Sequence, residues 1–375
     1  MLFLEKKSGR LERLHGGNIY RAALDFGGKP EDYLDFSSNT NPLGPSPRAL
    51  EAAAAVLADS WRYPDPECRE LREALAGYFG VPAERVLPGN GTSELINLLV
   101  PAFKIRRAVI PVPTFSEYAR CVCTWGGAVN PVRLSPEDGF RIDVGYLLQA
   151  LQGSDALFLC QPNNPTGRLM PYEDLSVLAV EAERTGAFLI VDEAFLDFVP
   201  ENAGLTAAGF LPRLSRVVIL RSLTKFFGLA GLRLGALVAV PELLEKVEAL
   251  TPPWNVNMPA QAAGVAAVQD EEYIRRTRQL IATERQFLAE ALGGLPGVRV
   301  FAGAANFLLL DIRNTGLSAG GIACRLAEKR ILVRDCGNFA GLNDGFIRVA
   351  VRLRRQNERL VEALKSVLRT GGRSD

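Results

Sequence analysis

Short apolar runs alternate with helix-like stretches between about residues 86 and 240, and this alternation constrains the fold more than any other feature. The runs are RAVIPV, AVNPVRL, DALFLCQP, AFLIVDEAF, RVVILRSL and LGALVAV. Such alternation is typical of a sheet whose strands are joined by crossover helices. The segments AFLIVD and RVVIL are almost continuously hydrophobic, which indicates strands that are covered on both faces. We therefore expect an α/β fold with a mostly parallel mixed sheet between helices.

The segments on either side of this region predict further elements. Residues 47–60 and 66–79 have the Leu and Ala spacing of helices, and each is expected to start at its proline. The C-terminal part mixes helices, expected in 261–270, 271–295, 322–330 and 357–370, with strands, expected in 298–302, 305–312, 331–334 and 346–351. We predict three parts: residues 1–45, contributing to the substrate site and the small domain; a large domain, 46–265; and a small α+β domain, 266–375.

The charge balance and the hydrophobic pattern exclude two classes of partner. The chain has 43 basic and 42 acidic residues, a formal net charge of +1, whereas a nucleic-acid-binding surface usually shows a basic excess. No apolar run approaches the ~18 residues of a membrane-spanning helix, and the apolar start at residues 2–4 is too short for a signal sequence. We expect a cytoplasmic protein with no nucleic-acid or membrane partner.

Cysteine and histidine usage argues against a metal site. The six cysteines include no CxxC pair, and we predict that they are reduced core thiols. His15 is the only histidine, which argues against His-rich zinc sites and against catalytic triads with an internal histidine. No metal is expected.

Lys225 is the first candidate for chemistry. It lies in SLTKFFGLAGLRLG, residues 222–235, directly after a predicted strand and before a glycine-rich turn. A lysine in a partly desolvated place has a lowered pKa and can form a Schiff base. A loop lysine is usually a solvated surface residue, so the residues around Lys225 must decide.

Two neighbouring segments place polar side chains at predicted strand ends. Asp192 is at the carboxyl end of AFLIVD, where open α/β sheets bind their ligands. A buried carboxylate needs a partner, and a pyridinium nitrogen would serve. QPNNPTG places Asn163 and Asn164 in a turn after another strand.

A third segment indicates a phosphate site. GNGT, residues 89–92, ends a predicted strand and leads into a helix, whose first N–H groups and dipole favour an anion. Ser222 and Arg233 flank Lys225 and could complete such a site. A lysine, a strand-end aspartate, an anion-binding helix start and a Ser/Arg pair together match what pyridoxal phosphate requires of a protein.

Four motifs carry a resemblance to a known family. GNGTSE, PNNPTG, VDEAF and SLTKFFGLAGLRLG resemble, in order and spacing, the fold-type I family of pyridoxal phosphate enzymes, and specifically its histidinol-phosphate aminotransferase branch. The resemblance covers nearly the whole chain. It implies that the cofactor is pyridoxal 5′-phosphate and that the large domain, residues 46–265, binds it.

Within that branch, three features resemble the threonine-phosphate decarboxylases of cobalamin biosynthesis. HGGNI, residues 15–19, precedes LDFSSNTNPLG; Phe195 stands where the aminotransferases usually carry a tyrosine; and ILVRDCGNFAGL with FIRVAVR resembles the decarboxylase ending. The resemblance implies decarboxylation of L-threonine O-3-phosphate to (R)-1-aminopropan-2-ol O-2-phosphate for the cobalamin nucleotide loop. L-serine O-phosphate is a further candidate substrate.

The resemblance also implies roles for individual residues. Lys225 would carry the cofactor as a Schiff base, and Asp192 would pair with its pyridinium nitrogen and make the ring a stronger electron sink. Further cofactor contacts would come from Asn164 at the ring O3′, Phe115 stacked on the ring, and Gly91, Thr92, Ser222 and Arg233 around the phosphate. Tyr63 would reach the cofactor phosphate of a neighbouring subunit, so we expect a homodimer with shared active sites.

A small phosphorylated amino acid is the expected substrate. Because it carries a carboxylate and a phosphate, it calls for guanidinium groups, and Arg334 and Arg348 match substrate-binding positions of the family. An arginine on an apolar strand otherwise usually points to solvent. The other substrate contacts that the resemblance implies are His15, Gly16, Asn39 and Asn164.

Two alternative functions remain. One is a histidinol-phosphate or related phospho-amino-acid aminotransferase, which would use the same arginines but expose the Cα proton instead of the carboxylate. HGGNI and Phe195 count against it. The other is a non-catalytic regulator on this fold, which would be expected to carry an added DNA-binding domain. The enzyme pattern already fills the 375 residues, and the retained Lys225 also disfavours a regulator.

Overall fold

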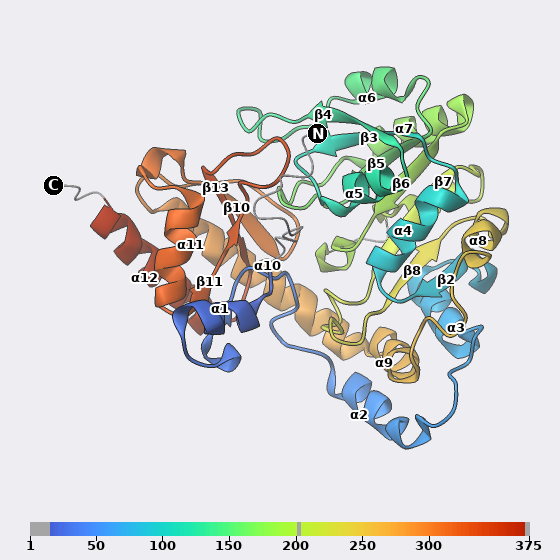
Figure 1. The fold of residues 1–375 in the computed structure, drawn as a ribbon, viewed down its shortest axis with the longest axis horizontal. Coiled ribbons are helices and arrows are strands. Elements are labelled where there is room, and N and C mark those ends of the chain that lie inside the picture. The colour runs from blue at the N-terminus through green and yellow to red at the C-terminus, as the bar shows by residue number, and fades with distance from the viewer. Residues whose placement is uncertain (1–15, 201–203, 372–375) are drawn as a thin grey trace.

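The computed structural model of the protein describes residues 16–200 and 204–371. In this part of the chain, seven strands form a central sheet in the order β2-β8-β7-β6-β5-β3-β4 (Figure 1). Strand β8 is antiparallel to both of its neighbours, and the other pairs are parallel, as the sequence predicts. The strands are β2 (Val86–Gly89), β3 (Arg107–Val112), β4 (Ala128–Arg133), β5 (Ala156–Cys160), β6 (Phe188–Asp192), β7 (Val217–Ser222) and β8 (Gly235–Val238).

Helices cover both faces of this sheet. Successive strand residues point to opposite faces, so Leu189 and Val191 of β6 join one hydrophobic core, and Phe188 and Ile190 join another. The first core includes side chains of α3 (Arg69–Phe79), α6 (Val144–Leu151), α7 (Tyr172–Thr185) and α9 (Met258–Val268). The second includes side chains of α4 (Thr92–Ala102), α5 (Glu117–Thr124) and α8 (Pro241–Glu248). The double cover confirms the prediction made from the continuous apolar runs.

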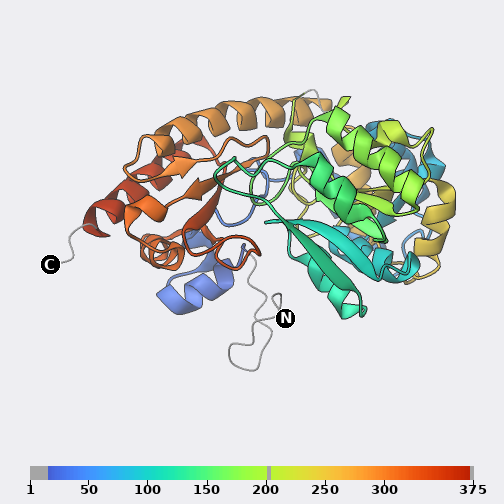
Figure 2. The ribbon, with the colours of Figure 1, turned by 90° about the horizontal axis from the view of Figure 1, so that it is seen from above.

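A smaller antiparallel sheet, in the order β12-β13-β10-β9, forms the centre of a second body. Its strands are β9 (Arg299–Val300), β10 (Phe307–Asp311), β12 (Arg334–Asp335) and β13 (Phe346–Ala350). The long helix α10 (Glu271–Gly293) runs from the first body along the second, as Figure 2 shows in orange. Helices α11 (Ala319–Glu328) and α12 (Arg354–Gly371) complete the second body, which has the α+β character expected.

The N-terminal segment lies against this second body. Strand β1 (Leu34–Asp35) pairs in parallel with β11 (Ile331–Leu332), and α1 (Ile19–Phe26), drawn in blue, lies beside the C-terminal elements in both views (Figures 1 and 2). Helix α2 (Pro47–Ala55) then packs on α9. Short 3-10 helices connect other elements: η1 (Pro30–Asp32), η2 (Leu57–Asp59), η3 (Ala83–Arg85), η4 (Leu196–Phe198), η6 (Ala207–Phe210) and η7 (Arg313–Thr315). A division of the chain at residues 45 and 265 stays a prediction.

Some predicted elements differ in the structure. The helix expected in residues 47–60 ends at Ala55 and is followed by the 3-10 helix η2. The single strand expected in residues 331–334 is split, because β11 pairs with β1 whereas β12 pairs with β13 in another sheet. Helix α3 begins at Arg69 and not at Pro66. The side chain of Asp65 explains the later start, since it accepts hydrogen bonds from the amides of Glu67 (3.1 Å) and Arg69 (2.9 Å) and so holds the intervening residues in a turn.

The prediction that all six cysteines are core thiols is wrong for two of them. Cys123 and Cys324 are exposed, because they fall on the solvent-facing sides of α5 and α11, while the other four are buried and all six are unbridged. Among the helices of the described residues, none has the length and apolarity needed to cross a membrane.

Candidate active site

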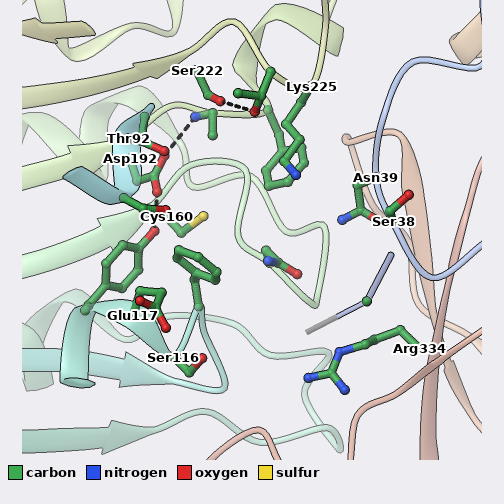
Figure 3. Close-up of a pocket in the computed structure, with 18 of the residues that line it drawn as sticks. Ser38, Asn39, Thr92, Ser116, Glu117, Cys160, Asp192, Ser222, Lys225 and Arg334 are labelled. Atoms are coloured by element: carbon green, nitrogen blue, oxygen red, sulfur yellow. Dashed lines mark hydrogen bonds between the residues drawn. The ribbon is translucent and has the colours of Figure 1, made fainter. Parts of the chain in front are cut away.

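A cavity of about 650 Å³ opens at the carboxyl ends of β5, β6 and β7, beside the second body. Figure 3 shows Asp192, Thr92 and Ser222 on one side and Asn39 and Arg334 on the other, with Lys225 between them. The residues of its wall that the sequence predicted are Gly16, Asn39, Thr92, Phe115, Asn164, Asp192, Ser222, Lys225, Arg233, Arg334 and Arg348. Strand ends therefore bring together residues that lie far apart in the sequence.

Lys225 lies three residues beyond the end of β7, with its side chain in the cavity. The pKa of its amine is lowered to about 8, chiefly by burial and also by the positive charges of Arg348 and Arg233, against the opposing effect of Asp192. A large share of the amine is therefore neutral at mildly alkaline pH. A neutral amine is the form that attacks a carbonyl carbon.

Asp192 ends β6 and is almost fully buried. Its Oδ2 accepts a hydrogen bond from the hydroxyl of Tyr118 at 2.5 Å, and its Oδ1 accepts one from the amide of Ala194 at 2.9 Å. Burial raises the pKa of this carboxyl, while both hydrogen bonds and the charge of Lys225 act in the opposite direction. A cationic nitrogen in the cavity would relieve the cost of burying the carboxylate.

An anion-binding end of the cavity forms where α4 begins. The amide of Thr92 opens this helix and has no carbonyl of its own helix to bond. A Cβ placed on Gly91 would lie 2.6 Å from Nη2 of Arg233, so this guanidinium rests directly on the glycine. Ser222 is buried nearby, and its hydroxyl is hydrogen-bonded to that of Thr224 at 2.7 Å.

One predicted donor at this end is already used. The amide of Gly91 donates to the carbonyl of Gly89 at 2.8 Å, so Gly91 contributes its lack of a side chain to this structure and not a free N–H group. A helix start, a guanidinium and two hydroxyls remain as donors. This donor set suits a phosphate.

Arg348, on β13, is buried in the cavity wall and does not point to solvent. Its guanidinium donates to Oδ1 of Asn164 and, at 2.8 Å, to the carbonyl of Ser37. Its Nε is buried and has no hydrogen-bond partner within the described part of the chain. Burial lowers the pKa of this guanidinium to about 10. An anionic ligand would satisfy both the charge and the unpaired donor.

Arg334 lies at the opposite side of the cavity on β12. It donates to the carbonyl of Asp335 at 2.6 Å and to Oδ1 of Asn338 at 2.7 Å, and its guanidinium lies 5.1 Å from the ring centre of Phe339. Asn338 and Phe339 also line the cavity. The side chain is thus held in place by its own loop. Its partners are neutral groups, which leaves its positive charge available to a ligand.

The N-terminal segment reaches the cavity through Gly16 and Asn39. Gly16 packs so closely on the carbonyl of Ser37 that a Cβ would lie 2.1 Å from this oxygen. Asn39 is buried, and its Oδ1 has no hydrogen-bond partner among residues 16–200 and 204–371. His15, the neighbour of Gly16, lies outside the described residues, so its predicted contact stays a prediction.

Two predicted aromatic contacts stay untested. Phe115 lines the cavity, with its ring edge-to-face on Tyr118 at 5.5 Å. Tyr63 is 75% exposed and stacks on Trp254 at 4.3 Å, away from the cavity wall of this subunit.

Sequence reasoning missed several residues of the wall. Tyr118, Cys160 and Thr224 lie among the predicted residues, and the ion pair of Glu117 with Arg120, 2.6 Å long, lines the cavity beside Phe115. The sequence carries no periodic signal for Tyr118. It follows Phe115 by three residues, but α5 begins at Glu117, so helical spacing does not place the two side chains on one face.

The residues present fit a group with three features: a carbonyl carbon, a ring nitrogen that binds a proton, and a phosphate. Lys225 has a depressed pKa, Asp192 is a buried carboxylate that a cation would stabilise, and Thr92 and Arg233 offer donors to an oxyanion. Pyridoxal phosphate has these features.

Comparisons with known proteins agree over both bodies. The family model "Aminotransferase class I and II" matches residues 31–364. The threonine-phosphate decarboxylase of Salmonella typhimurium is 39% identical over 358 residues, covering 94% of this chain and 96% of that protein. The histidinol-phosphate aminotransferase of Symbiobacterium thermophilum is 38% identical over 343 residues, covering 91% of this chain and 92% of that protein.

A solved structure of this family is similar to the chain over nearly its whole length. The histidinol-phosphate aminotransferase from Clostridium acetobutylicum superposes with a TM-score of 0.85 at 30% sequence identity, over 90% of this chain and 99% of that one. Overall similarity therefore does not separate decarboxylation from amino transfer.

Proposed function

The chain belongs to the family of class I and II aminotransferases and depends on pyridoxal 5′-phosphate, and from this premise we propose that it decarboxylates L-threonine O-3-phosphate. The product would be (R)-1-aminopropan-2-ol O-2-phosphate, a precursor of the cobalamin nucleotide loop. The observation that carries the proposal is the placement of two arginines, Arg334 and Arg348, in one cavity with Lys225. The two anionic groups of such a substrate match the two guanidinium groups, and its amine would lie beside Lys225, where the carbonyl carbon of the cofactor would be held.

The cofactor contacts follow from the site. Thr92, Ser222 and Arg233 would bind the phosphate, Asp192 would hold a proton on the ring nitrogen, and Lys225 would bind the carbonyl carbon. When bound, pyridoxal phosphate supplies an electron-accepting ring that is conjugated with the substrate Cα. Asp192 strengthens this acceptance because its negative charge stabilises the protonated ring nitrogen.

The substrate contacts use the unpaired groups of the wall. Arg348 and Arg334 would bind the carboxylate and the phosphate, and Nε of Arg348 and Oδ1 of Asn39 are buried polar atoms that a polar ligand would satisfy. We include Asn164, Gly16 and His15 as further contacts. The geometry supports either assignment of the two arginines to the two anionic groups.

Lys225 is placed to move the proton that the reaction needs. After CO2 leaves, the substrate Cα must gain one proton, and the amine of Lys225 can donate it because a pKa of about 8 keeps part of the population protonated near neutral pH. Decarboxylation rather than amino transfer is supported by HGGNI (residues 15–19) and Phe195, which resemble the corresponding residues of threonine-phosphate decarboxylases. It is also supported by the name of the Salmonella relative.

We further propose a homodimer whose sites are shared. Tyr63 belongs to a group of exposed aromatic and aliphatic side chains with Leu57, Trp61 and Trp254, which are 56%, 80% and 43% exposed. Burial of this group against a second copy would remove apolar surface from water. It would also allow Tyr63 to reach the partner's cofactor phosphate.

Product analysis tests the activity. The purified protein, loaded with pyridoxal phosphate, is incubated with L-threonine O-3-phosphate without any oxo acid, and CO2 is measured; L-serine O-phosphate is compared under the same conditions. A parallel reaction contains histidinol phosphate and 2-oxoglutarate, because a 38% identical relative is named for that substrate. CO2 release in the first reaction is the expected result. Glutamate formation in the second, with no CO2 in the first, would favour the aminotransferase.

A further inference from the structure

The hydroxyl of Tyr118 makes the shortest contact to Asp192, and nothing in the proposed mechanism so far uses it. The donor–acceptor distance is 2.5 Å, to Oδ2, while the amide of Ala194 binds Oδ1. Tyr118 is on α5 and Asp192 is at the end of β6, so the contact joins two elements that are 74 residues apart. Both side chains are at least 95% buried, as neither exceeds 4% exposure.

Tyr118 is held rigidly and keeps its hydroxyl proton for donation to Asp192. Its ring stacks on Phe158 at 5.5 Å and meets Phe115 edge-on at the same distance, so its orientation is fixed from two sides. Burial and the neighbouring charge of Asp192 raise its pKa well above the ordinary value, so the phenol keeps its proton. A charge-assisted hydrogen bond of this length holds the carboxylate in one orientation.

The other neighbour of the carboxylate is Cys160, the last residue of β5, which pairs with Asp192 across the sheet. Burial raises the pKa of its thiol, which stays neutral and lies 3.3 Å from the carbonyl of Pro162 as a donor. Among the described residues, the side-chain hydrogen bond to Asp192 comes from Tyr118, and the remaining side of the carboxylate faces the cavity (Figure 3).

We propose that Tyr118 is a positioning residue that keeps Asp192 ionised and aimed at the cofactor ring nitrogen. The proposal rests on the cofactor site described above and does not depend on whether the enzyme decarboxylates or transaminates. Its hydrogen bond favours the charged form of Asp192 and so offsets the burial that favours the neutral form. Without it, Asp192 would bind a proton more readily and hold the ring nitrogen less strongly.

The chain offers a matched control in Tyr78. Its hydroxyl donates to Oδ1 of Asp197 at 3.0 Å, and its pKa is raised by burial in the same way. Asp197 is a buried carboxylate paired with Arg221 and is not in the cavity wall. Tyr78→Phe therefore removes a partly buried tyrosine–carboxylate hydrogen bond without touching Asp192.

The experiment compares Tyr118→Phe and Tyr78→Phe with the wild-type chain. Each protein is stripped of cofactor, and the dissociation constant of pyridoxal phosphate is measured by fluorescence titration; the absorbance of the reloaded protein is then followed against pH. We expect Tyr118→Phe to bind cofactor more weakly, by up to about tenfold for each unit by which the hydrogen bond lowers the pKa of Asp192, because only the change in the charge of Asp192 reaches the cofactor. The pH midpoint of the absorbance change should rise by about half a unit or more. A cofactor ring with less positive charge repels a proton on the cofactor's other titrating groups less, so these groups lose their proton at higher pH.

A double variant separates positioning from folding. In the Asp192→Asn background, Tyr118→Phe should change cofactor affinity by less than about threefold, because its partner charge is already gone. Both Phe variants are expected to lower the melting temperature, so stability alone does not distinguish them. The proposal is overturned if Tyr118→Phe matches Tyr78→Phe in affinity and absorbance, or if its effect persists in full beside Asp192→Asn. A wild-type chain that binds no pyridoxal phosphate would refute the cofactor site itself.

Discussion

Replacing Gly91 by alanine tests the phosphate end of the cavity with the smallest change available. Gly91 has φ +77° and ψ 158°, a conformation that residues with a side chain rarely adopt, so about 1–3 kcal/mol of backbone strain is expected. The new methyl group would lie 2.6 Å from Nη2 of Arg233, closer than real Cβ contacts, so the guanidinium must move. Because this is the end of a flexible side chain, the fold should persist. The displaced donor is worth about 1.5–3 kcal/mol to a bound phosphate, so cofactor affinity should fall roughly ten- to hundredfold.

Gly27→Ala is the matched control. Gly27 has nearly the same backbone conformation, φ +76° and ψ 177°, but a Cβ there would meet nothing within 4 Å. Both variants should lose similar thermal stability, measured by circular dichroism on the cofactor-free proteins. Only Gly91→Ala should lose affinity in a fluorescence titration with pyridoxal phosphate. Unchanged affinity in folded Gly91→Ala, or an equal loss in Gly27→Ala, would refute the assignment of this glycine and Arg233 to the phosphate.

Three further predictions follow from the same site. Asp192→Asn should keep the fold and bind cofactor, yet lose about tenfold or more in kcat, because the lost charge supports the transition state more than the packing; near-normal turnover would make this carboxylate structural. In the cofactor-free protein, Lys225→Met should be more stable than wild type at pH 7 by up to about 3 kcal/mol. The unfolded wild-type chain protonates this lysine near pH 10.5 and the folded chain only near pH 8, so the free energy of unfolding of the wild type falls as the pH drops between these two values. Equal urea midpoints of the two proteins at pH 7 would argue against the lowered pKa of Lys225. Mixing inactive Tyr63→Ala with inactive Lys225→Ala should restore about a quarter of wild-type activity in a freely exchanging equal mixture, since half the dimers are mixed and each has one intact site; no recovery would place both residues in one subunit's site.

The sheet could be predicted because its signal is local. Each of the six apolar runs named from the sequence contains a strand, and the strands without polar interruption are those buried on both faces, as in Phe188–Asp192. Strand pairing is less visible in the sequence. Residues 331–334 read as one apolar strand, and only the three-dimensional arrangement shows that Val333 separates two strands of different sheets.

The site could be predicted where a residue's position along a strand decides its role. Asp192 and Ser222 are the last residues of their strands, so their place at the carboxyl edge follows from the pattern. Tyr118 was missed because its role depends on a contact with a residue 74 positions away. Amide donors were predicted only in part, because the hydrogen bond from Gly91 to Gly89 is a detail of turn geometry.

The central proposal is that the bond to the carboxylate breaks and that Lys225 returns a proton to Cα. Its most direct test is the reaction of L-threonine O-3-phosphate in heavy water without any oxo acid, followed by nuclear magnetic resonance and CO2 measurement. We predict one CO2 for each substrate consumed, and an aminopropanol phosphate with a single deuterium on the carbon that carried the carboxylate. Retention of the carboxylate, with deuterium exchanged at Cα, would contradict decarboxylation.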